Sequence, residues 1–308
     1  MVFLTGDDFD ITTAFAADFN IDLSKIHLFT SPGVYTQPMP NFPAQVLFML
    51  LSTAAAAQQS PVYPAVPADV SFEAVLELPV GTPDSRHTYG EASSQFAELW
   101  LPPATDGEAA VVAFVHGGCW LREYSIEHSH ALATGLNQAG YAVWNIEYRR
   151  VGETGGGWPG SLEDIRTALA QLQSLDPPGV DLDRLMLAGH SAGGHLALLA
   201  ADTTPAVGLA PIIDIADYAQ GSGSCNAAAV QFMGAEPVAA AAQYRVATPL
   251  PGPNDRVLMG TRDTIVPARD QYLPAGYAHW SDAGHFDWIH PGTPAWQEFL
   301  GQLHVLQP

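Results

Sequence analysis

A serine set between glycines carries the clearest chemical signal in this sequence. Residues 189–193 read Gly-His-Ser-Ala-Gly, the pattern G-x-S-x-G, after a strand-like run at 184–188 and at the start of a helix-like segment at 191–201. Small neighbours permit the sharp strand-to-helix turn that lifts a serine hydroxyl clear of a sheet. The turn also puts the backbone N–H of Ala192 at a helix N-terminus, where it can stabilise an oxyanion. The pattern predicts Ser191 as a nucleophile and Ala192 as an oxyanion-hole residue.

A second glycine pattern directly follows the apolar run at 109–115. Residues 116–120 read His-Gly-Gly-Cys-Trp, which matches the HGG-type oxyanion loop of lipases and esterases. We expect the amides around Gly118 and Cys119 to be the donors, with Gly117 shaping the loop and His116 bonding it. Cys119 stands where the esterase pattern often has a third glycine, so its side chain narrows the pocket while its N–H remains.

Together the two motifs resemble the α/β-hydrolase family. The closest resemblance is to its small esterases and arylformamidase-like enzymes, which carry H-G-G-x-W with G-H-S-A-G. It runs from about residue 85 to the C-terminus and includes Tyr-Arg-Arg-Val-Gly at 148–152 and Gly-Gly-Gly-Trp-Pro-Gly at 155–160. The resemblance implies that a nucleophile, an acid and a histidine follow one another along the chain.

The acid and the histidine are therefore expected after Ser191, near strand ends. Asp263 follows the run RVLMG and precedes a Val-Pro pair, which is the position of the family acid, and His285 stands in a Gly-His-Phe context. The resemblance implies that His285 takes the Ser191 proton and that Asp263 orients the imidazole. The alternatives are Asp214, Asp282 and Asp287 as the acid and His290 as the base.

Aromatic residues gather around these loops in the sequence. Trp120, Trp158 and Phe286 are predicted to line an apolar pocket for the acyl or alcohol group of a substrate. Ordinary core packing is the alternative for each of them.

The segments between the motifs predict how these residues are positioned. Strand-like runs at 94–101, 109–115, 141–148, 184–188, 206–209, 256–259 and 277–280 alternate with helix-like runs at 126–139, 161–175, 191–201 and 293–304. Such alternation predicts an α/β fold, with a mostly parallel central sheet and helices on both faces. The rhythm lapses at about 214–253, where we expect a short cap over the site.

The first 69 residues are expected to be an extension of a hydrolase domain at 70–308. Residues 39–57 have the length of a signal-peptide core and end in small residues, although no Lys or Arg lies between Met39 and Val46. A start of translation at Met39 would account for residues 1–38, and an N-terminal buried or interfacial helix is the alternative. Three prolines at 61–67 predict a stiff linker. We expect a periplasmic or secreted protein, with a cytoplasmic one as the alternative.

Composition narrows the range of partners. Asp and Glu total 32 against 11 Lys and Arg, a formal net charge of −21. Such a surface repels nucleic acid and anionic lipid, and the apolar run at 46–57 is too short to form a stable membrane span. The two cysteines show no CxxC or zinc-type spacing. Because Cys119 lies in the oxyanion loop, we expect no disulfide with Cys225. The sequence does not indicate the oligomeric state.

These observations predict a carboxylesterase-like serine hydrolase acting on esters of small to medium acyl groups through an acyl-enzyme. The chemistry calls for no metal or organic cofactor, because a triad supplies the nucleophile and an oxyanion hole the electrostatics. One alternative is an arylformamidase-like amidase of the N-formylkynurenine type. The other is a non-catalytic binding protein with a hydrolase fold.

The signal-peptide interpretation is testable on protein recovered from the native host. Cleavage after the alanines at 55–57 would leave a chain that begins near Gln58. N-terminal sequencing measures this directly, and a mature protein that retains residues 1–38 would contradict it.

Overall fold

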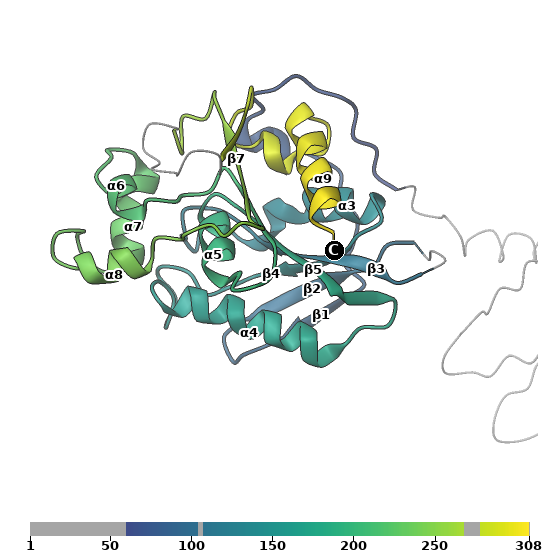
Figure 1. Cartoon of the computed structure of the whole chain (residues 1–308), viewed down its shortest axis with the longest axis horizontal. Coiled ribbons are helices and arrows are strands. Elements are labelled where there is room, and N and C mark those ends of the chain that lie inside the picture. The colour runs from purple at the N-terminus through teal and green to yellow at the C-terminus, as the bar shows by residue number, and fades with distance from the viewer. Residues whose placement is uncertain (1–59, 104–106, 268–277, 308) are drawn as a thin grey trace, which may run out of the picture. The chain divides into compact units, whose positions relative to one another are not determined.

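An eight-stranded sheet forms the centre of the protein (Figure 1), in the order β1-β2-β4-β3-β5-β6-β7-β8. The computed structural model describes residues 60–103, 107–267 and 278–307. The strands are β1 (Ser85–Thr88), β2 (Phe96–Trp100), β3 (Ala109–Val115), β4 (Ala142–Ile146), β5 (Val180–His190), β6 (Ala206–Leu209), β7 (Arg256–Gly260) and β8 (Ala278–Ser281).

The sheet is mostly parallel, as predicted. Strand β2 pairs antiparallel with both β1 and β4, whereas β4, β3, β5, β6, β7 and β8 pair in parallel. All seven residues of β3 are buried, which is typical of a parallel strand covered on both faces. The edge strand β1 was not predicted, because its sequence Ser-Arg-His-Thr is polar and only alternate residues are partly buried.

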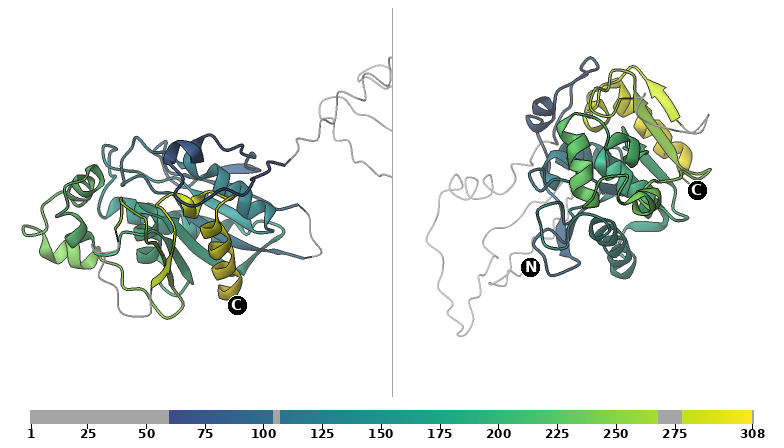
Figure 2. Two further views of the ribbon diagram at one scale, coloured as in Figure 1. Left: turned by 90° about the horizontal axis from the view of Figure 1, so that it is seen from above. Right: turned by 90° about the vertical axis from the view of Figure 1, so that its left-hand side faces the viewer.

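Helices cover both faces of the sheet. On one face, α4 (Gly160–Leu175) and α5 (Ala192–Ala200) pack against Val111, Ala113 and Val115 of β3. On the other face, α3 (His130–Gln138) and α9 (Pro294–Leu306) pack against Val112 and Phe114. The alternation of side chains along β3 thus supplies two separate cores, and Figure 2 shows the helices on the two sides of the sheet.

Three short helices lie between β6 and β7, in the region where a cap was predicted. They are α6 (Ile215–Tyr218), α7 (Ser224–Met233) and α8 (Ala241–Val246), and they gather at one end of the sheet (Figure 1). Helix α7 buries only part of its length, chiefly Ala228, Ala229, Phe232 and Met233. We term the segment 210–255 the cap.

Residues 60–70 form neither helix nor strand, and a backbone hydrogen bond holds them to the C-terminal part of the domain. The N–H of Val66 donates to the carbonyl of Gly292 at 2.9 Å, and a short helix, α2 (Phe72–Leu76), follows. The predicted signal-like segment at 39–57 lies outside the described residues. Within the described ranges, no helix is both long and apolar enough to cross a bilayer.

The packing of α5 against β3 generates a prediction on stability. A Cβ at Gly193 would lie 2.2 Å from the carbonyl oxygens of both Val115 and His116. Because these are backbone atoms, Gly193→Ala has to displace α5 or the strand end and should lower the free energy of unfolding by about 1–3 kcal/mol.

Gly301→Ala in α9 is the matched control, since nothing lies within 4 Å of its Cβ position. It should stabilise the protein by up to about 1 kcal/mol through helix propensity. Urea unfolding of both variants provides the measurement. Equal stability of Gly193→Ala and wild type would show that α5 does not press on β3 as described.

Candidate active site

The ends of four strands bring the predicted site residues to one edge of the sheet. The loop that begins at His116 follows β3, Ser191 follows β5, Asp263 follows β7, and His285 follows β8 by a few residues. Because these strands are parallel and lie in the order β3-β5-β6-β7-β8, their carboxyl ends open onto a common crevice.

Ser191 occupies a strained turn between β5 and α5. Its φ of 55° and ψ of −120° lie outside the regions that L-residues favour. The turn is held from both sides: the Ser191 N–H donates to Leu209 at 2.8 Å, and the Ser191 carbonyl accepts from His195 at 3.0 Å. The sharp strand-to-helix turn is the one predicted from the G-x-S-x-G pattern.

His285 and Asp263 are joined by a buried hydrogen bond. The distance from His285 Nδ1 to Asp263 Oδ2 is 2.7 Å, and both side chains are almost fully buried. The second oxygen of Asp263 accepts the N–H groups of Ile265 and Val266, each at 2.8 Å. A carboxylate fixed in this way favours a proton on Nδ1 and leaves Nε2 as the basic nitrogen.

The rival acids and the rival base lie elsewhere. Asp214 caps α6, where its Oδ1 accepts the Asp217 N–H at 2.9 Å, and Asp282 pairs with Arg262 in an exposed ion pair at 2.5 Å. His290 uses Nδ1 to accept the N–H of Gly292. None of these three side chains makes a bond to His285 among the described residues.

Asp287 positions the His285 loop, a function that the sequence did not reveal. Its carboxylate is completely buried and accepts the backbone N–H groups of Asp69, Val70 and Gly284 at 2.7–3.0 Å. Gly284 immediately precedes His285, so the bond fixes the backbone on which the imidazole stands. The signal in the sequence is an acidic residue two positions after the histidine, a position that also fits a rival acid.

Three successive residues of the loop that follows β3 have positive φ values. Gly118, Cys119 and Trp120 have φ values of 100°, 53° and 56°. Within the described residues, the N–H groups of Gly118 and Cys119 donate to no other group, and both residues line the cavity beside Ser191. Ala192 is the first residue of α5, where an N–H has no acceptor inside the helix.

Two neighbouring glycines give this loop its close packing. Gly117 lies against His190 and Ser191, since a Cβ there would be 2.9 Å from the His190 carbonyl oxygen. A Cβ at Gly118 would be 2.3 Å from the Tyr124 Cβ. Gly117 is not among the residues that line the cavity, in keeping with the expected shaping role.

His116 is a structural residue of the same loop. Its Nδ1 bonds the Gly117 carbonyl at 2.9 Å and its Nε2 bonds Glu147 at 2.8 Å, so both nitrogens are occupied. Glu147 also accepts two backbone N–H groups and lies 3.3 Å from Arg150. Burial raises the pKa of Glu147, but His116 and Arg150 outweigh it, and the pKa lies below its ordinary value. Glu147 was not predicted, because its only signal in the sequence is a charge at the end of an apolar strand.

Two further buried histidines face the cavity. Burial and the nearby His116 lower the pKa of His128 to about 3. Burial and the facing His285 hold the pKa of His190 well below its ordinary value. A neutral His190 donates from Nε2 to the His285 carbonyl at 2.9 Å and so adds a second hold on the His285 backbone.

A cavity of about 320 Å³ contains Ser191 and His285. One wall is aromatic, because Phe72 contacts Tyr124, His128 and Phe286 with ring centroids 5.3–5.8 Å apart. The other wall comes from the cap and the Asp263 loop: Tyr218, Gly223, Ser224, Cys225, Asn226, Thr264 and Ile265.

Two of the three predicted pocket aromatics lie outside this cavity. Phe286 lines it. Trp120 is fully buried and stacks on Phe232 of α7 with centroids 4.7 Å apart, and Trp158 packs against the same ring. Both tryptophans therefore anchor the cap, which is the core-packing alternative.

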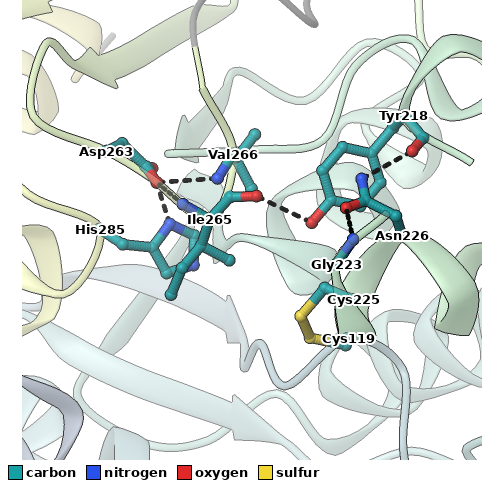
Figure 3. The surroundings of a disulfide bond; sticks show 9 residues. All are labelled: Cys119, Tyr218, Gly223, Cys225, Asn226, Asp263, Ile265, Val266 and His285. Atoms are coloured by element: carbon teal, nitrogen blue, oxygen red, sulfur yellow. Dashed lines mark hydrogen bonds and ion pairs between the residues drawn. A yellow bond between two sulfur atoms is a disulfide. The ribbon is translucent and has the colours of Figure 1, made fainter. Parts of the chain in front are cut away.

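Cys119 and Cys225 form a disulfide, so the expectation of two unpaired cysteines is wrong (Figure 3). The cap returns over the site and brings the first turn of α7 beside the oxyanion loop, with the two Cα atoms 5.2 Å apart. A separation of 106 residues hides such a contact from any spacing argument.

Metal-binding geometry is not found among the described residues, since no three His, Cys, Asp or Glu side chains gather in a group that could hold an ion. The arrangement at the site instead offers a hydroxyl, a basic imidazole nitrogen and unpaired amides around one cavity. These are the groups that acyl transfer requires.

Comparison with known proteins finds a matching family model and curated esterases. The model of the BD-FAE family matches residues 97–264, a range that includes the oxyanion loop, Ser191 and Asp263. Esterase LipC of Mycobacterium tuberculosis is 32% identical over 117 residues, which cover 37% of this chain and 28% of LipC. The isoprenylcysteine alpha-carbonyl methylesterase ICME of Arabidopsis thaliana is 31% identical over 117 residues, covering 36% of this chain and 26% of that protein. The chain thus matches less than a third of the length of these curated relatives.

Solved structures share the fold. Esterase B from Lactobacillus rhamnosis superposes with a TM-score of 0.59 at 18% identity, over 85% of this chain and 93% of that one. A truncated carbohydrate esterase from gut microbiota gives a TM-score of 0.61 at 16% identity, over 74% of this chain and 96% of the other. At these identities the likeness establishes the α/β-hydrolase fold.

The Asp263–His285 bond generates a prediction on turnover. Asp263→Asn should reduce kcat for an activated ester such as p-nitrophenyl acetate by up to about 10⁴-fold, because an amide in that position favours the wrong histidine tautomer. Asp214→Asn is the matched control and should have a much smaller effect, since Asp214 only caps α6. Steady-state kinetics of both variants provide the measurement, and a greater loss in Asp214→Asn would reverse the assignment of the acid.

Proposed function

The chain belongs to the BD-FAE family of α/β-hydrolases, and from this premise we propose that it hydrolyses carboxylic esters at Ser191. The observation that carries the proposal is the buried His285–Asp263 bond at the cavity that Ser191 lines. A histidine fixed by a carboxylate beside a serine on a strained turn is the arrangement that activates a hydroxyl for attack.

Acylation begins with attack of Ser191 Oγ on the ester carbonyl carbon. His285 Nε2 removes the hydroxyl proton, and Asp263 stabilises the imidazolium that forms. The carbonyl oxygen becomes an oxyanion and accepts hydrogen bonds from the N–H groups of Gly118, Cys119 and Ala192. Collapse of the tetrahedral intermediate expels the alcohol, which takes the proton from His285, and leaves the acyl group on Ser191.

Deacylation repeats these steps with water as the nucleophile. His285 removes a proton from the water, the oxyanion forms again in the same hole, and the acid leaves as Ser191 regains its proton. The side chains and amides supply the nucleophile, the base and the electrostatic stabilisation, so each step is complete with this chain's own groups.

The size of the cavity supports the proposal that the substrates carry small to medium acyl groups. Its volume of about 320 Å³ is at the lower end of the range for small-molecule sites. The aromatic wall built on Phe72 and Phe286 favours apolar groups, and the named relatives include esterases and a methylesterase.

We also propose that the protein acts in an oxidising compartment, periplasmic or extracellular. The Cys119–Cys225 disulfide supports this proposal, because structural disulfides persist in such compartments and are rare in the cytosol.

Ser191→Ala tests the proposed nucleophile. It should reduce kcat for p-nitrophenyl esters by about 10⁴-fold or more, because the attacking oxygen is gone. It should also abolish labelling by a fluorophosphonate probe, which requires an activated serine. Thermal unfolding serves as the control for folding. Full ester hydrolysis by Ser191→Ala would contradict the proposal.

A panel of substrates distinguishes ester hydrolysis from formamide hydrolysis and from non-catalytic binding. Esters of increasing acyl length and an aryl formamide should be compared at equal concentration. Ester hydrolysis should predominate, whereas a strong preference for the formamide would indicate the arylformamidase-like activity. Wild-type protein that neither labels nor turns over any of these substrates would indicate a non-catalytic binding protein.

A further inference from the structure

The cap supplies one wall of the cavity, and the two halves of its helix α7 differ in how firmly they are held to the domain. The C-terminal half of α7 is buried, with Phe232 stacked on Trp120 and its carbonyl accepting the Trp158 N–H at 2.8 Å. The N-terminal end has no such packing, since residues 220–224 are exposed. Yet Gly223, Ser224, Cys225 and Asn226 are the residues of α7 and its approach that line the cavity. Burial therefore holds the half of α7 that does not form the wall.

Most hydrogen bonds near this wall connect one cap residue to another. Asn226 accepts the Gly223 N–H at 2.9 Å and donates to the Tyr218 carbonyl at 2.7 Å. Tyr218 in turn donates its hydroxyl to the Ile265 carbonyl at 3.0 Å, in the loop that follows Asp263. Figure 3 shows this chain of contacts from His285 to the cap. One end of the wall is thus tied to the acid loop.

The other end is tied by the disulfide. Cys225 is the second residue of α7, and its partner Cys119 is an expected oxyanion donor. The disulfide is therefore the covalent connection between the exposed end of the wall and the loop beside Ser191. Both cysteines line the cavity, so the position of one wall depends directly on this bond.

The backbone of Cys119 gives an independent reason to see a function in this bond. Its φ of 53° is a conformation that favours glycine, and the esterase pattern often has a glycine there. Because cysteine stands at this position in spite of the unfavourable conformation, we expect the Cys119 sulfur to have a function.

We propose that the Cys119–Cys225 disulfide determines the size of the acyl group that the site accepts, by holding the N-terminal end of α7 close to the oxyanion loop. This inference rests on the proposed ester hydrolysis at Ser191. With the bond intact, the cavity is short and excludes long acyl chains. Without it, the exposed residues 220–224 and the first turn of α7 that follows them can move outward, and the cavity lengthens.

The test compares kcat/KM for p-nitrophenyl acetate and octanoate in oxidised wild type, in Cys225→Ser and in reduced wild type. Reduction transfers two electrons and two protons from dithiothreitol to the sulfur atoms, giving two thiols, while dithiothreitol closes to its cyclic disulfide. A thiol assay confirms that two thiols have formed. The ratio of kcat/KM for octanoate to acetate should rise about tenfold or more in both samples, the discrimination expected when an apolar pocket gains room.

A stability control distinguishes a local effect of the disulfide on the cavity from a general loss of stability. Leu303→Ala in α9, on the opposite face of the sheet, removes a fully buried side chain and lowers stability without touching the cap. Its octanoate-to-acetate ratio should equal that of wild type. An equal rise in Leu303→Ala would overturn the proposal, because general loosening would then explain the effect.

Three further outcomes would each contradict the inference. An unchanged ratio in a sample with two titrated thiols overturns this inference while ester hydrolysis at Ser191 stands. Unfolding of both Cys225→Ser and reduced wild type overturns it as well, since the bond would then be needed for the fold itself. Wild type that hydrolyses no ester refutes the proposed function, and this inference with it.

Discussion

The left-handed backbone of Ser191 is the constraint on which the site depends. A non-glycine residue at a φ of 55° and a ψ of −120° costs about 1–3 kcal/mol and persists only where its surroundings allow no alternative. Here β5 fixes one side of the turn and α5 the other, and α5 is pressed so closely on the end of β3 that Gly193 has no room for a Cβ. The parallel sheet with its covering helices is therefore what presents the hydroxyl of Ser191 at the crevice.

Buried carboxylates hold the loops around that turn. Asp263 accepts two backbone N–H groups beside its bond to His285. Asp287 binds the backbone before His285 together with residues 69–70, and Glu147 binds His116 and two amides below the oxyanion loop. A buried carboxylate is tolerated only when its oxygens accept hydrogen bonds. Each of these carboxylates therefore requires the loop that donates those bonds to keep one conformation. Such anchors follow no sequence spacing, and this is why only Asp263, which stands in a motif, was predicted.

What the sequence could predict depends on how far apart the interacting residues lie. The G-x-S-x-G turn is local, and the structure has the predicted strand, serine and helix there. The fold was predictable for the same reason, because each strand and helix has its own periodic pattern. Contacts made through the cap were not predictable. Trp120 was expected in the pocket, but its partner Phe232 lies more than a hundred residues further on, and the Cys119–Cys225 pair is separated by 106 residues.

The two sides of the cavity are held by different forces, and this separates catalysis from the choice of substrate. The side with Ser191, His285 and the unpaired amides is fixed by strand ends and buried carboxylates, whose loss would disturb the domain as a whole. The cap side is held by the packing of Phe232 on Trp120 and, at the end of α7 that lines the cavity, by the Tyr218 hydrogen bond to Ile265 and the disulfide. A change confined to the cap can therefore alter which substrates enter while the groups that react stay in place. Because functional segments that adjust come from the less stable parts of a fold, the weakly buried end of α7 is where substrate preference is expected to vary.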